Sequence, residues 1–163
     1  MRILFLLTFG LVLMSCGNNT PADARQEAAD AAATATAEPK ATLPSLPIVT
    51  LEYLWKSCDF VDYVFYELPV SMSLDNKKTI QYVLSHIAED PAPLRPECKS
   101  IGRIFYQVEG ENVLEADMYF SEGCTYLVFL EDGKAKYANY MTKDGVDYLN
   151  NNFQQVNKMT QGQ

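Results

Sequence analysis

The chain of 163 residues contains only one histidine, one tryptophan and four cysteines. A single histidine and the lack of any Cys-x-x-Cys pair argue against the common zinc sites. Basic side chains are also scarce, with 13 lysines and arginines against 21 aspartates and glutamates and a formal net charge of −8. Nucleic-acid-binding domains need clustered positive charge, so this balance argues against that class. We therefore expect no metal, no other cofactor and no nucleic-acid partner.

Long apolar runs are scarce as well, and the run near the start covers only Ile3–Met14. It is too short for a mature membrane-spanning helix, but it follows the basic Arg2 and has the length of a secretory signal. The run ends in Leu13-Met14-Ser15-Cys16, which resembles the lipobox of bacterial lipoproteins, where a small residue precedes a cysteine. The resemblance covers about the first 18 residues. It implies that residues 1–15 are removed and that Cys16 is lipidated; an ordinary secretory signal is the alternative.

The same resemblance implies a location for the mature chain. In bacterial lipoproteins an aspartate directly after the lipidated cysteine favours the inner membrane, and here that position is Gly17. We therefore expect acyl chains such as palmitate to hold the protein in the outer membrane of the cell envelope, facing the periplasm. Loss of Arg2 with the signal leaves 12 basic and 21 acidic side chains, a net charge of −9, which is typical of a solvated surface.

A tether is predicted between the lipid and the folded domain. Ten of the 22 residues from Pro21 to Thr42 are alanine, and no large apolar side chain precedes Leu43, so the segment cannot bury a core. As a flexible coil it would span on the order of 30 Å. We divide the chain into a signal peptide (1–15), lipidated Cys16 with the tether (16–47), and one globular domain (48–163).

Helical and strand patterns alternate in that domain. Apolar residues at helical spacing predict three helices, begun by Thr50, Asp75 and Asp144 and continuing to residues 58, 88 and 156. A strand is predicted at 61–68, with 70–74 as a candidate extension, and four more strands follow between 101 and 141. The order helix, strand, helix, four strands, helix predicts an α+β fold, with a mostly antiparallel sheet of about five strands and three flanking helices.

The four consecutive strands carry the most detailed expectations. We interpret Gly110-Glu111-Asn112 as a three-residue hairpin loop, so that residues whose numbers sum to 222 face each other. Residues 125–131 are apolar without alternation, which indicates a strand covered on both faces. The alternating lysines at the start of Lys134–Met141 indicate an edge strand. In the first helix, Trp55 and Cys58 lie on the apolar stripe, which predicts that the only tryptophan is a core residue.

An exported protein is expected to use its cysteines in a disulfide. The predicted register places Cys98 opposite Cys124, and their bond would add about 3 kcal/mol of stability in the chain-entropy model. Cys58 remains open as an alternative partner of either cysteine. Otherwise it is an inert buried thiol, because burial on an apolar stripe raises the pKa of a cysteine.

Three groups of side chains are candidates for chemistry. His86 has no second histidine and no nucleophile motif, and a half-exposed place at the helix margin is the simpler interpretation. Asp59 and Asp62 are too sparse for a calcium loop. The least ordinary group shares one face of the first hairpin and can bind a polar or cationic ligand, although a solvated cross-strand ion pair is the simpler interpretation. That group consists of Arg103, Glu115, Asp117 and Tyr119, with Gln107 beside them.

No nucleophile and base stand in a recognisable catalytic pattern, so the leading hypothesis is a lipid-anchored, non-enzymatic envelope domain. Its partner is a protein or a small ligand that the sequence does not identify. An envelope hydrolase that uses Glu115 and Asp117 is the first alternative. A structural lipoprotein that braces the envelope is the second.

Overall fold

The computed structural model describes residues 42–161; the predicted signal peptide, Cys16 and most of the predicted tether lie outside this range. Within it, seven strands form one antiparallel sheet and three helices pack against the sheet. The strand order is β2-β1-β4-β5-β6-β7-β3. The predicted α+β class is confirmed, whereas the expected number of five strands is too low by two.

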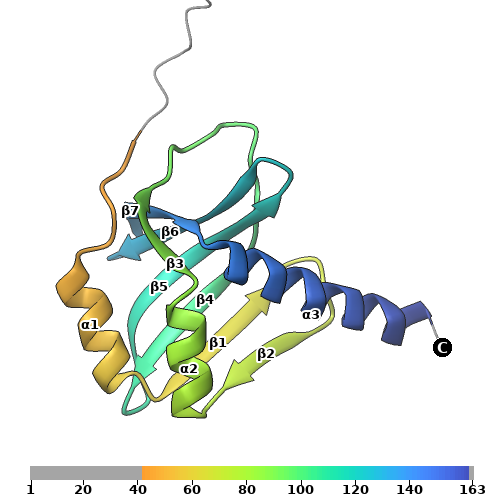
Figure 1. Cartoon of the computed structure of the whole chain (residues 1–163), viewed down its shortest axis with the longest axis horizontal. Coiled ribbons are helices and arrows are strands. Elements are labelled where there is room, and N and C mark those ends of the chain that lie inside the picture. The colour runs from red at the N-terminus through yellow and green to blue at the C-terminus, as the bar shows by residue number, and fades with distance from the viewer. Residues whose placement is uncertain (1–41, 162–163) are drawn as a thin grey trace, which may run out of the picture. The chain divides into compact units, whose positions relative to one another are not determined.

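The three helices lie on the same face of the sheet (Figure 1). They are α1 (Ile48–Ser57), α2 (Lys77–Leu84) and α3 (Lys143–Gln161). The strands are β1 (Phe60–Phe65), β2 (Ser71–Leu74), β3 (Ile87–Pro91), β4 (Ser100–Val108), β5 (Glu111–Ser121), β6 (Cys124–Glu131) and β7 (Lys134–Met141).

The two strands that raise the number to seven lie at the two edges of the sheet. β2 is not an extension of β1, because the chain turns back and pairs Ser73 with Asp62. β3 begins inside the segment predicted to be helical, which extended to residue 88: α2 ends at Leu84, and Ile87 pairs with Met141 of β7. The prediction of β7 as an edge strand is therefore wrong, since β3 covers the end of β7 that lies away from its lysines. This pairing is non-local, and the helical spacing of Ile87 concealed it.

The N-caps of the three helices lie one to three residues away from their predicted positions. Before α2, the side chain of Asn76 rather than Asp75 accepts hydrogen bonds from the backbone amides of Lys78 and Thr79. Before α3, Thr142 rather than Asp144 accepts from the amide of Gly145. α1 starts at Ile48, after Pro47, without a side-chain cap. Short polar residues compete for the cap position, and the local sequence alone does not rank them.

The β4–β5 hairpin differs from the predicted register. Its turn is the pair Glu109-Gly110, both with positive φ, so Val108 faces Glu111. One extra residue in β5, Val113, then forms a bulge, and beyond it residues whose numbers sum to 220 face each other. Partners therefore shift by two residues from the predicted sum of 222. Because the shift is even, the side chains from Arg103 to Tyr106 and from Leu114 to Met118 keep their predicted faces, whereas a second irregularity between Ser100 and Gly102 interrupts the alternation at the start of β4.

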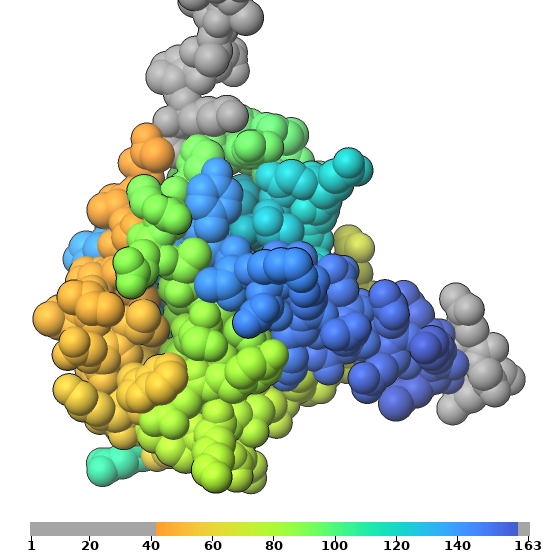
Figure 2. Space-filling view, in the orientation of Figure 1, coloured from red at the N-terminus to blue at the C-terminus, as the bar shows by residue number. Residues whose placement is uncertain are grey.

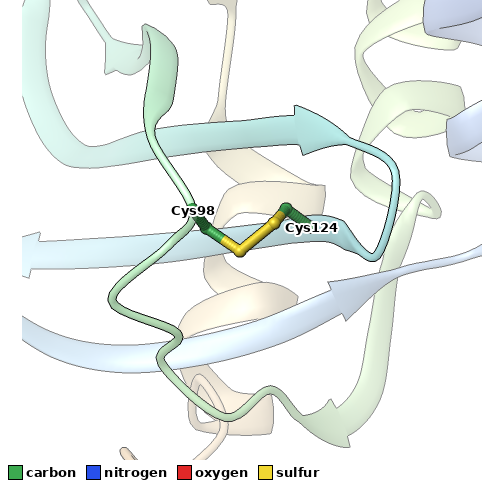
Figure 3. Close-up of a disulfide and its surroundings, with 2 residues drawn as sticks. All are labelled: Cys98 and Cys124. Carbon is green, nitrogen blue, oxygen red and sulfur yellow. A yellow bond between two sulfur atoms is a disulfide. The ribbon is translucent and has the colours of Figure 1, made fainter.

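Strand β6 is buried on both faces, as its unbroken apolar run predicted. Towards the helices, Leu127 and Phe129 belong to the main core. Away from the helices, Tyr126 and Val128 belong to a second, smaller cluster, which the loop between β3 and β4 covers. A disulfide between Cys98 in that loop and Cys124 at the start of β6 holds the loop in place (Figure 3). The Cα atoms of the two cysteines are 5.8 Å apart, and this is the pairing preferred from the sequence.

The folded part begins before Ile48, inside the predicted tether. Leu46 is buried, and its backbone amide donates to the side-chain oxygen of Asn139 at 2.8 Å. The amide group of Asn139 donates in turn to the carbonyl of Ala88 in β3, also at 2.8 Å. A further bond runs from the amide of Ala138 to the carbonyl of Pro44. The buried Asn139 thus ties the N-terminal segment to both β7 and β3, which corrects the boundary at residue 48.

The placement of Trp55 is also corrected. The side of α1 that faces the core buries Leu54 and Cys58, whereas Trp55 is 42% exposed. Leu54 is the only buried residue of α1 itself, so the helix buries a narrow stripe and leaves an apolar residue one position further round at the surface.

Candidate functional site

The candidate side chains lie on the face of the sheet opposite the helices. Arg103 pairs with Asp117 across β4 and β5, and Phe105 pairs with Glu115, so all four side chains project to the same side. β1 extends this surface, because Val64 pairs with Arg103. We call this surface the open face and define it by the residues Asp62, Val64, Tyr66, Arg103, Phe105, Glu115 and Asp117.

Arg103 lies between the two carboxylates and binds both. Its Nε donates to Oδ1 of Asp117 at 2.9 Å, and its Nη1 donates to Oε2 of Glu115 at 3.0 Å. The three side chains are 20–33% exposed. The hydroxyl of Tyr66, the residue that follows β1, donates to Asp117 Oδ1 at 3.4 Å. The cluster thus combines one cation and two anions at the surface of the sheet.

The electrostatics of this cluster are those of a partly solvated ion pair. The hydrogen bond to Asp117 raises the pKa of the Arg103 guanidinium above its already high ordinary value. Pairs with this degree of exposure contribute about 1 kcal/mol or less to stability, because water screens them. The formal charge that remains is −1, spread over two carboxylates. The arrangement therefore holds the three side chains in a defined geometry and offers a weakly negative surface.

Tyr119 shares this face of the sheet but belongs to a different cluster. Its ring stacks on Tyr126 with centroids 4.6 Å apart, beside the disulfide-anchored loop, and burial raises the pKa of its hydroxyl. Gln107 pairs with Phe60 and with Asn112 near the hairpin turn. Of the four predicted site residues, the structure therefore joins Arg103, Glu115 and Asp117 and assigns Tyr119 to the packing under the loop.

Sequence analysis missed the contribution of β1 to this surface. Val64 and Tyr66 alternate with the buried Tyr63 and Phe65, so the pattern showed that they face away from the core. It did not show which strand lies beside β1, because the β1–β4 pairing joins residues about 40 positions apart.

His86 occupies a different environment from the predicted helix margin. It follows the end of α2 and is only 6% exposed, with its ring against Tyr82 of α2 and Tyr148 of α3. Burial lowers its pKa, and Asp144 partly opposes this. Its Nε2 is buried without a hydrogen-bond partner in the structure. The prediction of a half-exposed residue is wrong, because α3 packs over it.

The other candidate groups serve the fold. Asp59 accepts from the amide of Glu109 at 2.8 Å and thereby supports the β4–β5 turn, and Asp62 accepts from the hydroxyl of Ser73 at 2.6 Å. Cys58 lies outside the disulfide, fully buried, and desolvation raises its pKa. Within residues 42–161, no group of three or more His, Cys, Asp or Glu side chains is arranged to hold a metal ion.

Comparisons with family models, with curated proteins and with solved structures give no match for this chain. The part of the chain that the structure describes contains no helix long and apolar enough to cross a membrane. The N-terminal motif and the surfaces of the described domain are therefore the features from which a function can be inferred.

Proposed function

We propose that this chain is a lipid-anchored protein of the bacterial cell envelope, whose domain binds a protein partner through the open face and has no catalytic role. The anchor is inferred from the motif that ends at Cys16 and from the position of Gly17, which favours the outer membrane. The surface is inferred from the observation that three helices cover one face of the sheet and leave the β1–β4–β5 part of the other face accessible (Figure 1).

The hydrogen bonds that Glu115 and Asp117 accept from Arg103 favour binding over hydrolysis. A hydrolytic carboxylate must be free to contact water or substrate, and a carboxylate that is bound to a guanidinium is less available for that contact. Glu115 and Asp117 both accept from the same guanidinium at 3.0 Å or less. A hydrolase that uses this pair is therefore the weaker hypothesis.

The apolar side chains around Arg103 favour a protein partner over a small ligand. Val64 on β1 and Tyr66 directly after β1 are exposed, and Phe105 is half-buried on β4. Aromatic and arginine side chains side by side are typical of the residues that dominate protein interfaces. An extended strand surface of this kind fits a partner's surface better than it encloses a small molecule.

The anchor is tested by Cys16→Ser in the full-length chain. We expect the unsubstituted protein to incorporate a palmitate analogue in growing cells and to fractionate with outer membranes. The variant should lose the label and the membrane association. If both proteins fractionate alike and neither is labelled, the anchor is refuted.

The binding face is tested by photo-crosslinking in intact cells. A photoreactive phenylalanine analogue at position 105 should yield a discrete crosslinked product, whereas the same analogue at the exposed Lys158 on α3 should not. A second substitution, Val64→Asp, should remove the product while the domain stays folded. Equal yields at the two positions, or insensitivity to Val64→Asp, would contradict the proposal.

The two alternatives predict different results. If the domain were a hydrolase, Glu115→Gln and Asp117→Asn would abolish turnover of a substrate in a broad panel. If it only braced the envelope, crosslinks from position 105 would lead to the cell wall or to abundant membrane proteins without a defined stoichiometry.

A further inference from the structure

Helix α1 exposes more apolar surface than its role in the core requires. Ile48 is 60% exposed, and Val49 and Trp55 are also exposed. Ile48, Leu51 and Trp55 occur at helical spacing, and together with Glu52 they line a cavity of about 190 Å³ on the outside of the helix. This cavity lies away from the open face, because α1 packs on the opposite side of the sheet.

A second cavity continues the first towards the edge of the sheet. It measures about 250 Å³ and lies between α1 and β3. The two cavities share Ile48 and Leu51 and are therefore neighbours along α1, and together their lining residues extend from Trp55 to β3. In Figure 2 the surface of α1 lies directly beside that of β3. We call this the α1–β3 groove, and its residues are Leu46, Ile48, Leu51, Glu52, Trp55, Ile87, Ala88, Glu89 and Asn139.

The walls of the groove are held in place by hydrogen bonds. Asn139 bonds to the amide of Leu46 on one side and to the carbonyl of Ala88 on the other, both at 2.8 Å. The hydroxyl of Ser45 donates to the carbonyl of Glu89 at 2.7 Å. A rigid apolar depression binds at a lower entropic cost than a surface that must first become ordered.

The charges of the groove select among its candidate occupants. Glu52 and Glu89 line it, and the exposed Asp90 follows Glu89 directly. Lys56 forms an exposed ion pair with Glu52 at 3.7 Å, so negative charge remains in excess. A second copy of this acidic chain would bring like charges together, and an anionic lipid surface would be repelled. A cationic segment is complementary.

We propose that the α1–β3 groove binds a peptide segment of a partner protein in which a bulky apolar side chain is flanked by lysine or arginine. The apolar side chain enters the depression beside Ile48 and Leu51 and packs on the Trp55 indole. The basic residues meet Glu52 and Glu89. Exposed tryptophans in a preformed pocket are typical anchors of such contacts. This site shares no residue with the open face, so the two proposals stand or fall separately.

The test uses the fact that Trp55 is the only tryptophan in the chain, so its fluorescence reports directly on the groove. The full-length protein in nanodiscs of zwitterionic lipid is titrated with acetyl-Lys-Phe-Leu-Lys-amide and with acetyl-Glu-Phe-Leu-Glu-amide. We expect a saturable blue shift of the emission with the basic peptide and binding about tenfold weaker or less with the acidic one. Absence of a saturable change, or equal affinity for the two peptides, overturns the proposal.

Variants separate the charge effect from the apolar one. Glu52→Gln combined with Glu89→Gln should bring the two peptides within about threefold of each other, while Glu122→Gln in the distant β5–β6 turn should change nothing. Ile48→Ser should abolish the blue shift and keep the domain folded, because Ile48 is already largely exposed. If the charge variants bind the basic peptide as tightly as the unsubstituted protein, the assignment is wrong.

Two further measurements identify other occupants. Brominated lipid in the nanodisc should leave Trp55 emission unchanged, and quenching would mean that the groove faces the membrane. Dilution should likewise leave the emission unchanged, and a concentration-dependent shift would mean that a second copy fills the groove. Either result would refute a peptide partner.

Discussion

The two faces of the sheet are built from the same strands and differ in almost everything else. Towards the helices, Ile104, Tyr106, Ala116 and Met118 are almost completely buried in one continuous core. On the opposite side, the neighbouring residues of the same strands form the open face, with its three-membered ion cluster. A strand places alternate side chains on opposite sides, so one sequence encodes both surfaces at once.

The opposite face is itself divided in two. Over β6 and β7 it is closed by the loop that the disulfide holds, and Tyr126, Val128 and Ala138 are buried there. Over β1, β4 and β5 the side chains remain partly exposed. Burial on this face therefore depends on a covalent bond and a loop rather than on helices. The helix side therefore contains the main core, whereas the open face keeps partly exposed side chains.

The largest expected difference between the faces comes from a matched pair of phenylalanines. Phe129→Ala removes a fully buried ring from the helix side and should lower the free energy of unfolding by about 3–5 kcal/mol. Phe105→Ala on the open face should lower it by about 1 kcal/mol or less, because its ring is already partly exposed. Urea unfolding measures both. Equal losses would mean that the open face is covered by something other than solvent.

The disulfide tests how the closed part of the opposite face is maintained. Replacement of Cys98 and Cys124 by serine should lower stability by about 3 kcal/mol through the entropy of the unfolded chain. Hydrogen exchange should increase in the loop and in β6 before it increases in the helices. Reduction of the disulfide in the parent protein should give a similar loss, since it breaks the same bond without changing a side chain and the remaining thiol, Cys58, is in no disulfide. Uniform protection in the double variant would show that the loop packs without the bond.

Asn139 tests whether residues 42–47 belong to the fold. Asn139→Leu leaves the amide of Leu46 and the carbonyl of Ala88 without their partners and should cost about 2 kcal/mol. Asn150→Leu on the exposed side of α3 is the matched control and should have little effect. Proteolysis should then cut near residue 46 in the first variant only. If Asn139→Leu unfolds at the same urea concentration as the parent, the segment does not contribute to stability.

The buried His86 gives the helix side of the sheet a pH dependence. Burial lowers its pKa in the folded state, so its contribution is complete above the unfolded value of about 6.5 and is lost as the pH falls below it. The slope for this proton is at most about 1.4 kcal/mol per pH unit. His86→Phe keeps an aromatic ring against Tyr82 and Tyr148 but removes the titrating group. The loss of stability between pH 7.5 and pH 5 that is due to His86 should therefore be absent from this variant. Unfolding midpoints near pH 7.5 and pH 5 measure it, and an unchanged pH dependence would contradict this assignment.

The smallest effect is expected at the centre of the open face. Arg103→Met breaks two partly solvated ion pairs and should change the free energy of unfolding by about 1 kcal/mol or less. Its effect on the crosslink from position 105 should be much larger than its effect on stability. A loss of several kcal/mol would show instead that the cluster is structural.

Local patterns predicted much of this molecule. The unbroken apolar run of 125–131 predicted a strand buried on both sides, and the faces of the β4 and β5 side chains between the two register shifts were predicted correctly despite the wrong register. The reason is that alternation depends only on parity, and the bulge at Val113 restored the parity that a two-residue turn would have lost. The cluster of Arg103, Glu115 and Asp117 was found for the same reason.

Other features were invisible to those patterns because they depend on contacts between distant segments. Ile87 has helical spacing, yet it lies in β3 because it pairs with Met141 at the edge of β7. Trp55 has the position of a core residue, yet α1 rests on the sheet with a narrower stripe than its sequence offers. His86 is buried only because α3 returns from the end of the chain to cover it.

The sequence alone determined the alternation of buried and exposed side chains, the approximate positions of most elements, the acidic balance and the motif at Cys16. These properties follow from residue type and spacing, which are local. Tertiary structure decided the two edge strands, the start of the fold before Ile48, the burial of His86 and the exposure of Trp55. Each of these depends on which surface meets which, and that is settled by the competition of all apolar surfaces for burial rather than by any one segment.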